Sequence, residues 1–176
     1  PRDLQSFPTR RSSDLHISAY LLDSGIATLR FNQRGVGMSS GETGDGPEEL
    51  KDTQSVVNMT TINPKIDGSR LGIVGYSFGA WMALESSLRS NSIKSLVSIA
   101  CPQNKFAQYG TVQITQPKLL ILGDRDHDFT IGQFRFLSNR MSEPKRTEVI
   151  TGADHFFRSH TELVAELAGE FLKETL

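Results

Sequence analysis

The sequence has a single cysteine, Cys101, among its 176 residues. One cysteine cannot form an internal disulfide and is typical of reducing compartments, which predicts a cytoplasmic location. Long hydrophobic runs are also missing, since the longest has about six residues and a transmembrane helix needs about 20. Neither sign of charge dominates, because 19 basic residues stand against 20 acidic ones. The sequence therefore predicts no membrane span and no binding surface for nucleic acid.

The first fifteen residues, PRDLQSFPTRRSSDL, differ in composition from the rest of the chain. They are polar and basic, with no helical or strand periodicity, and Pro8 interrupts them. The stretch from Ser6 to Leu15 resembles the translation of a common sequencing adapter. We therefore expect residues 1–15 to be non-native and irregular, a single domain to span residues 16–176, and the gene to be truncated upstream.

Short apolar runs alternate with longer amphipathic segments along the rest of the chain, which predicts alternating strands and helices. Strands are expected at residues 26–31, 71–74, 93–100, 117–122 and 146–150. Helices are expected at residues 16–24, 47–61, 77–89, 131–141 and 161–172. This order predicts an α/β fold, with a doubly wound, mainly parallel sheet covered by helices on both faces.

The segment LGIVGYSFGAW contains the pattern G-x-S-x-G, with Ser77 at its centre. The pattern alone is weak, but a predicted strand precedes it and a predicted helix follows it. A sharp strand-to-helix turn exposes the serine hydroxyl and points the N–H of Phe78 into the same space. Ser77 is thus a candidate nucleophile, and a purely structural glycine-rich turn is the alternative.

A serine nucleophile needs a base and an acid that orients the base. In doubly wound sheets such residues follow the carboxyl ends of strands. Asp124, Asp126 and Asp128 follow one predicted strand, and His155 follows the next. The order serine, aspartate, histidine at successive strand ends favours a hydrolytic triad.

With these motifs in place, the chain resembles the α/β-hydrolase superfamily, and most closely its small lidless bacterial members of the dienelactone-hydrolase-like and prolyl-peptidase-like kinds. The resemblance spans residues 16–176 and is carried by GIATLRFNQRGVGMSSGE, IDGSRLGIVGYSFGAWMAL, PKLLILGDRD and GADHFF. It implies the hydrolase fold without its first three strands, with residues 26–31 as the fourth strand. It also implies an open site for a small acyl substrate.

The resemblance implies a catalytic triad of Ser77, Asp126 and His155, with the backbone N–H of Phe78 in the oxyanion hole. Asp126 is favoured as the acid because the family acid lies three residues after a glycine, while Asp124 and Asp128 compete with it. The second oxyanion donor belongs, in the family, to an upstream loop. The predicted function is a serine hydrolase for esters or small amides, in a fragment expected to be nearly inactive. A non-catalytic binding protein and an acyl transferase are the alternatives.

Two other patterns are weaker. Gly35, Gly37 and Gly41 follow a predicted strand, but their spacing does not match a dinucleotide-binding fingerprint and no helix opens there. Arg34 in the same loop is expected to form structural ion pairs. Acidic residues and histidines around residues 124–128 and 154–155 could imitate a metal site, but further ligands are missing. No cofactor and no metal are therefore predicted.

Overall fold

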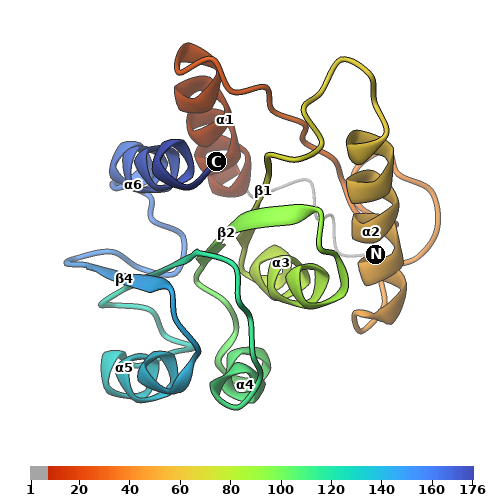
Figure 1. Cartoon of the computed structure of the whole chain (residues 1–176). Helices are drawn as coiled ribbons and strands as arrows, with labels where there is room; N and C mark the ends of the chain where they lie inside the picture. Colours follow the sequence, from red (N-terminus) through yellow and green to blue (C-terminus); the bar gives the residue numbers. More distant parts are fainter. Residues whose placement is uncertain (1–7) are drawn as a thin grey trace.

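In the computed structural model, which describes residues 8–176 with their side chains from Asp14 onward, helices and strands alternate along the chain (Figure 1). The helices are α1 (Pro8–Asp23), α2 (Pro47–Thr61), α3 (Phe78–Arg89), α4 (Gln103–Phe106), the 3-10 helix η2 (Ala107–Gly110), α5 (Ile131–Arg140) and α6 (Thr161–Thr175). The strands are β1 (Leu71–Tyr76), β2 (Ile93–Ile99), β3 (Lys118–Gly123) and β4 (Lys145–Ile150).

The four strands form one parallel sheet in the order β1-β2-β3-β4. Tyr76 pairs with Ile99 at the end of the first ladder, and Gly123 pairs with Ile150 at the end of the last. The carboxyl ends of all four strands therefore lie along one edge of the sheet, which is where α/β folds place their sites. The predicted α/β fold with a parallel sheet is confirmed.

Helices cover both faces of the sheet and bury one apolar cluster on each. Figure 1 shows α1 and α6 side by side on one face, and α3, α4 and α5 on the other. On the first face Val97 and Ile121 pack against α6 residues such as Ala168. On the second face Leu120 packs with Leu84 and with other residues of that cluster.

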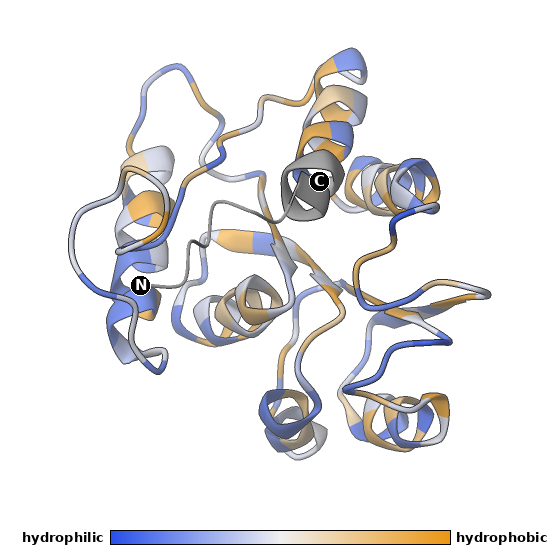
Figure 2. Cartoon of the chain, turned by 180° about the vertical axis from the view of Figure 1, so that it is seen from behind, coloured by the Kyte–Doolittle hydropathy of each residue, from blue (hydrophilic) through white to orange (hydrophobic). Residues whose placement is uncertain are grey.

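The helices carry both hydrophobic and hydrophilic residues, as the view from behind coloured by hydropathy shows (Figure 2). This is expected for helices with one buried stripe. No helix of the described residues is long and apolar enough to cross a membrane.

The strand expected at residues 26–31 is wrong. None of the strand ladders among the described residues includes this segment, and β1 forms an edge of the sheet. Leu29 and Phe31 remain 49% and 41% exposed. A strand exists only when a neighbour accepts its backbone hydrogen bonds, so an alternating apolar pattern without a neighbour leaves irregular chain. Five strands were expected from the sequence, and the sheet has four.

The expected irregular structure before His16 is wrong for residues 8–15, and residues 1–7 lie outside the described residues. Helix α1 begins at Pro8 and includes the helix that the apolar spacing predicts from His16. Proline suits a first helical turn, and no glycine or second proline follows before Gly25. Because adding residues to an existing helix is easy compared with nucleating one, the helix extends toward the N-terminus.

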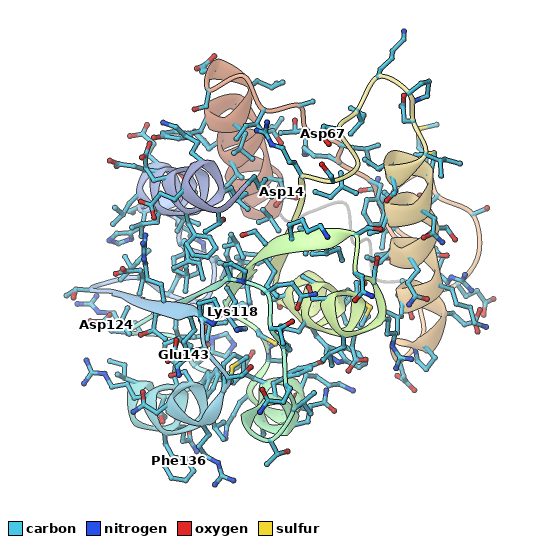
Figure 3. All side chains as sticks on the ribbon, viewed as in Figure 1. Asp14, Asp67, Lys118, Asp124, Phe136 and Glu143 are labelled. Atoms are coloured by element: carbon cyan, nitrogen blue, oxygen red, sulfur yellow. The ribbon has the colours of Figure 1, made fainter. Side chains whose placement is uncertain are left out.

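Lys118 begins β3 and is completely buried, although it is a cation. Its ammonium donates hydrogen bonds to the carbonyl oxygens of Ser142 (3.0 Å) and Pro144 (2.9 Å), just before β4. Figure 3 shows Lys118 next to Glu143. Burial lowers the pKa of Lys118 to about 8. This lysine therefore ties the amino ends of β3 and β4 together at the cost of desolvating a charge.

Replacing Lys118 by methionine is expected to remove a pH-dependent part of the stability. The folded chain disfavours the ammonium, so the free energy of unfolding rises as pH increases from about 8 toward 10.5, the ordinary pKa that the unfolded lysine keeps. A pKa difference from about 8 to 10.5 corresponds to about 3 kcal/mol. The rise is at most this large, because the two carbonyl hydrogen bonds favour the ammonium form and so oppose the effect of burial. Urea unfolding at a series of pH values measures it, with Lys94→Met on the exposed surface as the control. An equal rise in Lys118→Met and Lys94→Met would contradict this reading.

Candidate active site

Ser77 lies between β1 and α3 in a backbone conformation that L residues rarely adopt, with φ 52° and ψ −117°. Its N–H donates to the carbonyl of Ile99 at the end of β2 (2.8 Å), which fixes the turn to the sheet. A side chain at Gly75 would collide with the backbone of Gly79, since a Cβ there would lie 2.0 Å from the Gly79 oxygen. Glycine at position 75 is what lets α3 begin so close to β1.

Phe78 is the first residue of α3, so its backbone N–H has no carbonyl acceptor within the helix. This N–H and the positive end of the helix dipole both lie beside the Ser77 side chain, where they favour negative charge. The Phe78 ring packs edge-on against Trp81, with 5.5 Å between the ring centroids. The side chain of Phe78 therefore contributes to packing within α3.

Three polar side chains from three strand ends form one chain of hydrogen bonds. The Oγ of Ser77 lies 3.1 Å from Nε2 of His155, and Nδ1 of His155 lies 2.8 Å from Oδ2 of Asp126. All three residues are buried, with exposures of 8%, 5% and 9% in the same order. In the tautomer that carries its proton on Nδ1, His155 donates to Asp126 and accepts from Ser77. The structure brings together the serine, aspartate and histidine that the sequence singles out.

Asp126 is ionised although it is buried. Burial opposes the charged form, but the hydrogen bond from His155 and a second one from the N–H of Asp128 (2.9 Å) outweigh it and lower the pKa of Asp126. The fixed negative charge of Asp126 lies next to Nδ1 of His155, where it can stabilise an imidazolium formed when His155 accepts a proton. The electrostatics suit a base that is oriented by an acid.

The two competing aspartates occupy other positions. Asp124 accepts a hydrogen bond from the N–H of Gly152 (2.7 Å), so it joins the loop after β3 to the loop after β4. Asp128 is exposed, and its carboxylate lies 3.4 Å from Nε2 of His127.

The possible ligand atoms of Asp126, Asp128 and His155 do lie within 4.8 Å of one another. However, the facing atoms of Asp126 and His155 already bond to each other, which favours a proton relay over metal coordination.

Arg34 lies outside this cluster and forms ion pairs with α2. Its guanidinium donates to both carboxylate oxygens of Asp52 (2.6 and 2.9 Å) and to Glu48 (2.9 Å). The bidentate geometry attaches the glycine-rich loop to α2. A structural role for Arg34 was the expectation from the sequence.

One contact of the site has no counterpart in the sequence patterns. The hydroxyl of Tyr76, the residue just before Ser77, donates a hydrogen bond to the backbone carbonyl of His155. The two rings are also close, with their centroids 5.8 Å apart. A side-chain bond to the carbonyl of a residue 79 positions away leaves no periodicity or motif, so only the structure reveals it.

Comparison with known proteins agrees with this geometry. The family model for the dienelactone hydrolase family matches residues 29–169. An uncharacterized protein of Rickettsia prowazekii (strain Madrid E), RP471, is 32% identical over 160 residues, which cover 86% of this chain and 67% of the relative. The structure of an α/β serine hydrolase homologue from Coxiella burnetii superposes with a TM-score of 0.82 at 28% identity, covering 97% of this chain and 80% of that one. A lidless α/β serine hydrolase from Xanthomonas campestris has the same fold, with a TM-score of 0.82, 22% identity and coverage of 99% and 78%.

The parallel sheet with helices on both faces, together with the match to the Coxiella burnetii structure, places the chain among the α/β hydrolases. Within that class the extent of the family match is decisive, because it covers most of the described chain. The chain belongs to the dienelactone hydrolase family.

Proposed function

We propose that the protein is a serine hydrolase that cleaves esters or small amides through an acyl-enzyme intermediate. The observation that carries the proposal is the unbroken chain of hydrogen bonds from Ser77 through His155 to Asp126, with donor–acceptor distances of 3.1 and 2.8 Å. Its three members come from three separate loops and are buried at the edge where α/β folds place their sites. Acyl transfer through a serine ester uses all three together, and water is the acyl acceptor that we propose.

In the proposed reaction, Oγ of Ser77 attacks the carbonyl carbon of the substrate as its proton passes to Nε2 of His155. The tetrahedral intermediate collapses, the alcohol or amine leaves with the proton from His155, and Ser77 keeps the acyl group. Water then attacks the acyl-enzyme, with His155 again taking a proton and returning it to Ser77. Asp126 keeps its charge throughout and stabilises the imidazolium.

The negative charge of the tetrahedral intermediate forms next to the N–H of Phe78, which is already oriented by the start of α3. Phe78 is the one oxyanion donor that we identify among the described residues. Removing a single donor from such a site costs about 10²–10³-fold in rate. We therefore expect this 176-residue chain to form the acyl-enzyme but to turn over slowly.

Small substrates suit the surroundings of the triad. The segment after β2 folds as α4 and η2, and its aromatic residues Phe106 and Tyr109 are buried in the core with exposures of 1% and 0%. A segment whose aromatic side chains are buried in the core packs against the sheet, and it is not free to act as a lid over the triad. This arrangement favours the open, lidless site and the small acyl substrate expected from the sequence.

A fluorophosphonate probe tests the proposal, because it phosphonylates a serine only when a neighbouring base activates the hydroxyl. Mass spectrometry of the digested chain is expected to find the modification on Ser77, with no labelling of Ser77→Ala. A fluorogenic acetate or butyrate ester is expected to give a slow rate above that variant. Absence of labelling on the folded wild type would instead support a non-catalytic binding protein. New ester that forms faster than the free acid at a low concentration of added alcohol would identify an acyl transferase.

A further inference from the structure

Tyr76 joins the strand that ends at the nucleophile to the loop that carries the base. It is the last residue of β1, directly before Ser77, and its backbone is held in register with Ile99 of β2. From this fixed position its hydroxyl donates to the backbone carbonyl of His155. The hydrogen bond therefore connects the residue before Ser77 to His155, whose imidazole must lie next to the Ser77 hydroxyl.

The loop from β4 to α6 has no regular structure, so contacts from other elements must fix the position of His155. Two of these contacts come from the loop after β3: Asp124 accepts from the N–H of Gly152, and the N–H of Arg125 donates to the carbonyl of Ala153 (2.9 Å). Both contacts hold residues that precede His155 in the loop. The bond from Tyr76 acts on His155 itself and comes from the strand of the nucleophile.

Packing supports the same contact. The Tyr76 ring lies near the His155 ring and also edge-on to the Phe157 ring, with 6.3 Å between the centroids of Tyr76 and Phe157. Phe157 is fully buried and has a positive φ of 50°, so the chain turns sharply just after His155. The ring of Tyr76 thus contacts aromatic rings on this turn, while its hydroxyl donates to the His155 carbonyl.

We propose that Tyr76 is a positioning residue of the hydrolytic site, whose hydroxyl holds the backbone of His155 so that Nε2 stays within reach of Ser77. This inference rests on the proposed function. Since Nε2 and Oγ are 3.1 Å apart, a small shift of the loop would lengthen the bond through which the proton moves. Misplacement of a catalytic group by about 1 Å costs about 10²-fold in rate. The hydrogen bond from Tyr76 ends on the backbone carbonyl of His155, so we place its effect on the reaction in the position of that residue.

Tyr76→Phe tests the proposal, because it removes the hydroxyl and keeps the ring with its contacts to His155 and Phe157. The expected result is a fall of about 10–100-fold in kcat and in the rate of fluorophosphonate labelling, with KM within about twofold of wild type. Tyr109→Phe is the matched control. This substitution also removes a hydroxyl that donates a hydrogen bond, to Glu85 of α3 (2.7 Å), from a completely buried side chain of η2. We expect Tyr109→Phe to lose about as much stability as Tyr76→Phe, while its kcat stays at the wild-type value.

A second measurement works without turnover. The proton between Nδ1 of His155 and Asp126 is expected to give a proton NMR signal downfield of the amide region, and this signal should broaden or vanish in Tyr76→Phe and persist in Tyr109→Phe. An unchanged signal together with an unchanged labelling rate in Tyr76→Phe would overturn the proposal. If the wild type itself is not labelled, the proposed hydrolase function fails, and the NMR comparison still decides whether Tyr76 holds His155.

Discussion

Ester hydrolysis is expected to fall by about 10⁴-fold or to the background rate when Ser77 is replaced by alanine. The substitution removes the atom that forms the acyl-enzyme, and no other nucleophile in the described site takes its place. Cys101 is buried, and burial raises the pKa of its thiol, so it offers no reactive thiolate. Stability should change little, because Ser77 is the end of the hydrogen-bond chain and alanine keeps the Cβ. Initial rates on a fluorogenic ester and thermal unfolding measure the two effects.

His155→Ala provides the companion experiment. It is expected to lose about as much activity as Ser77→Ala, because a serine hydroxyl without its base is a poor nucleophile at neutral pH. The double variant should be no worse than either single variant, since residues that act as a unit show non-additive losses. Losses that add in the double variant would mean that Ser77 and His155 act independently, against the proposed mechanism.

Asp126→Asn is expected to lower kcat by about 10³–10⁴-fold, somewhat less than the loss of the nucleophile. Asparagine has nearly the same shape, but it removes the charge that stabilises the imidazolium. Its amide can also donate to Nδ1 of His155, which then favours the tautomer with its proton on Nε2 and leaves Ser77 without an acceptor. Steady-state kinetics over a pH series measure the loss in kcat.

The control is Asp124→Asn, two residues away in the same loop. Its side-chain oxygen would still accept the hydrogen bond from Gly152, so kcat should stay within about tenfold of wild type. The comparison decides between the two aspartates that the sequence leaves in competition. If Asp124→Asn lost more activity than Asp126→Asn, the acid of the proposed triad would have to be reassigned.

Much of the fold could be predicted from the sequence where a pattern depends on nearby residues. Helix α2 has its predicted bounds, because Pro47 and the following acidic residues mark its start. The four strands lie within a few residues of the predicted ranges, because each is a short apolar run between turn signals. The segment 26–31 has an equally good pattern and fails, since strand formation depends on a neighbour that the pattern does not report.

The site shows the same division. Ser77, Asp126 and His155 could be located because the carboxyl ends of parallel strands meet at one edge, so positions along the chain translate into positions in space. The choice of Asp126 over its neighbours came from a resemblance, and the structure supplies the distance on which it depends. Tyr76 could not be located, since its contact is one hydroxyl and one distant carbonyl.

The strained backbone at Ser77 has a consequence for the history of the gene. At φ 52° and ψ −117° a glycine is relaxed, whereas a residue with a Cβ carries about 1–3 kcal/mol of strain. A duplicate of this gene released from selection for chemistry would gain stability from a serine-to-glycine change, and random mutation would favour the loss of the hydroxyl over its retention. The serine is therefore the residue that neutral drift would remove early, and its retention is what selection for the proposed reaction, rather than for the fold, would produce.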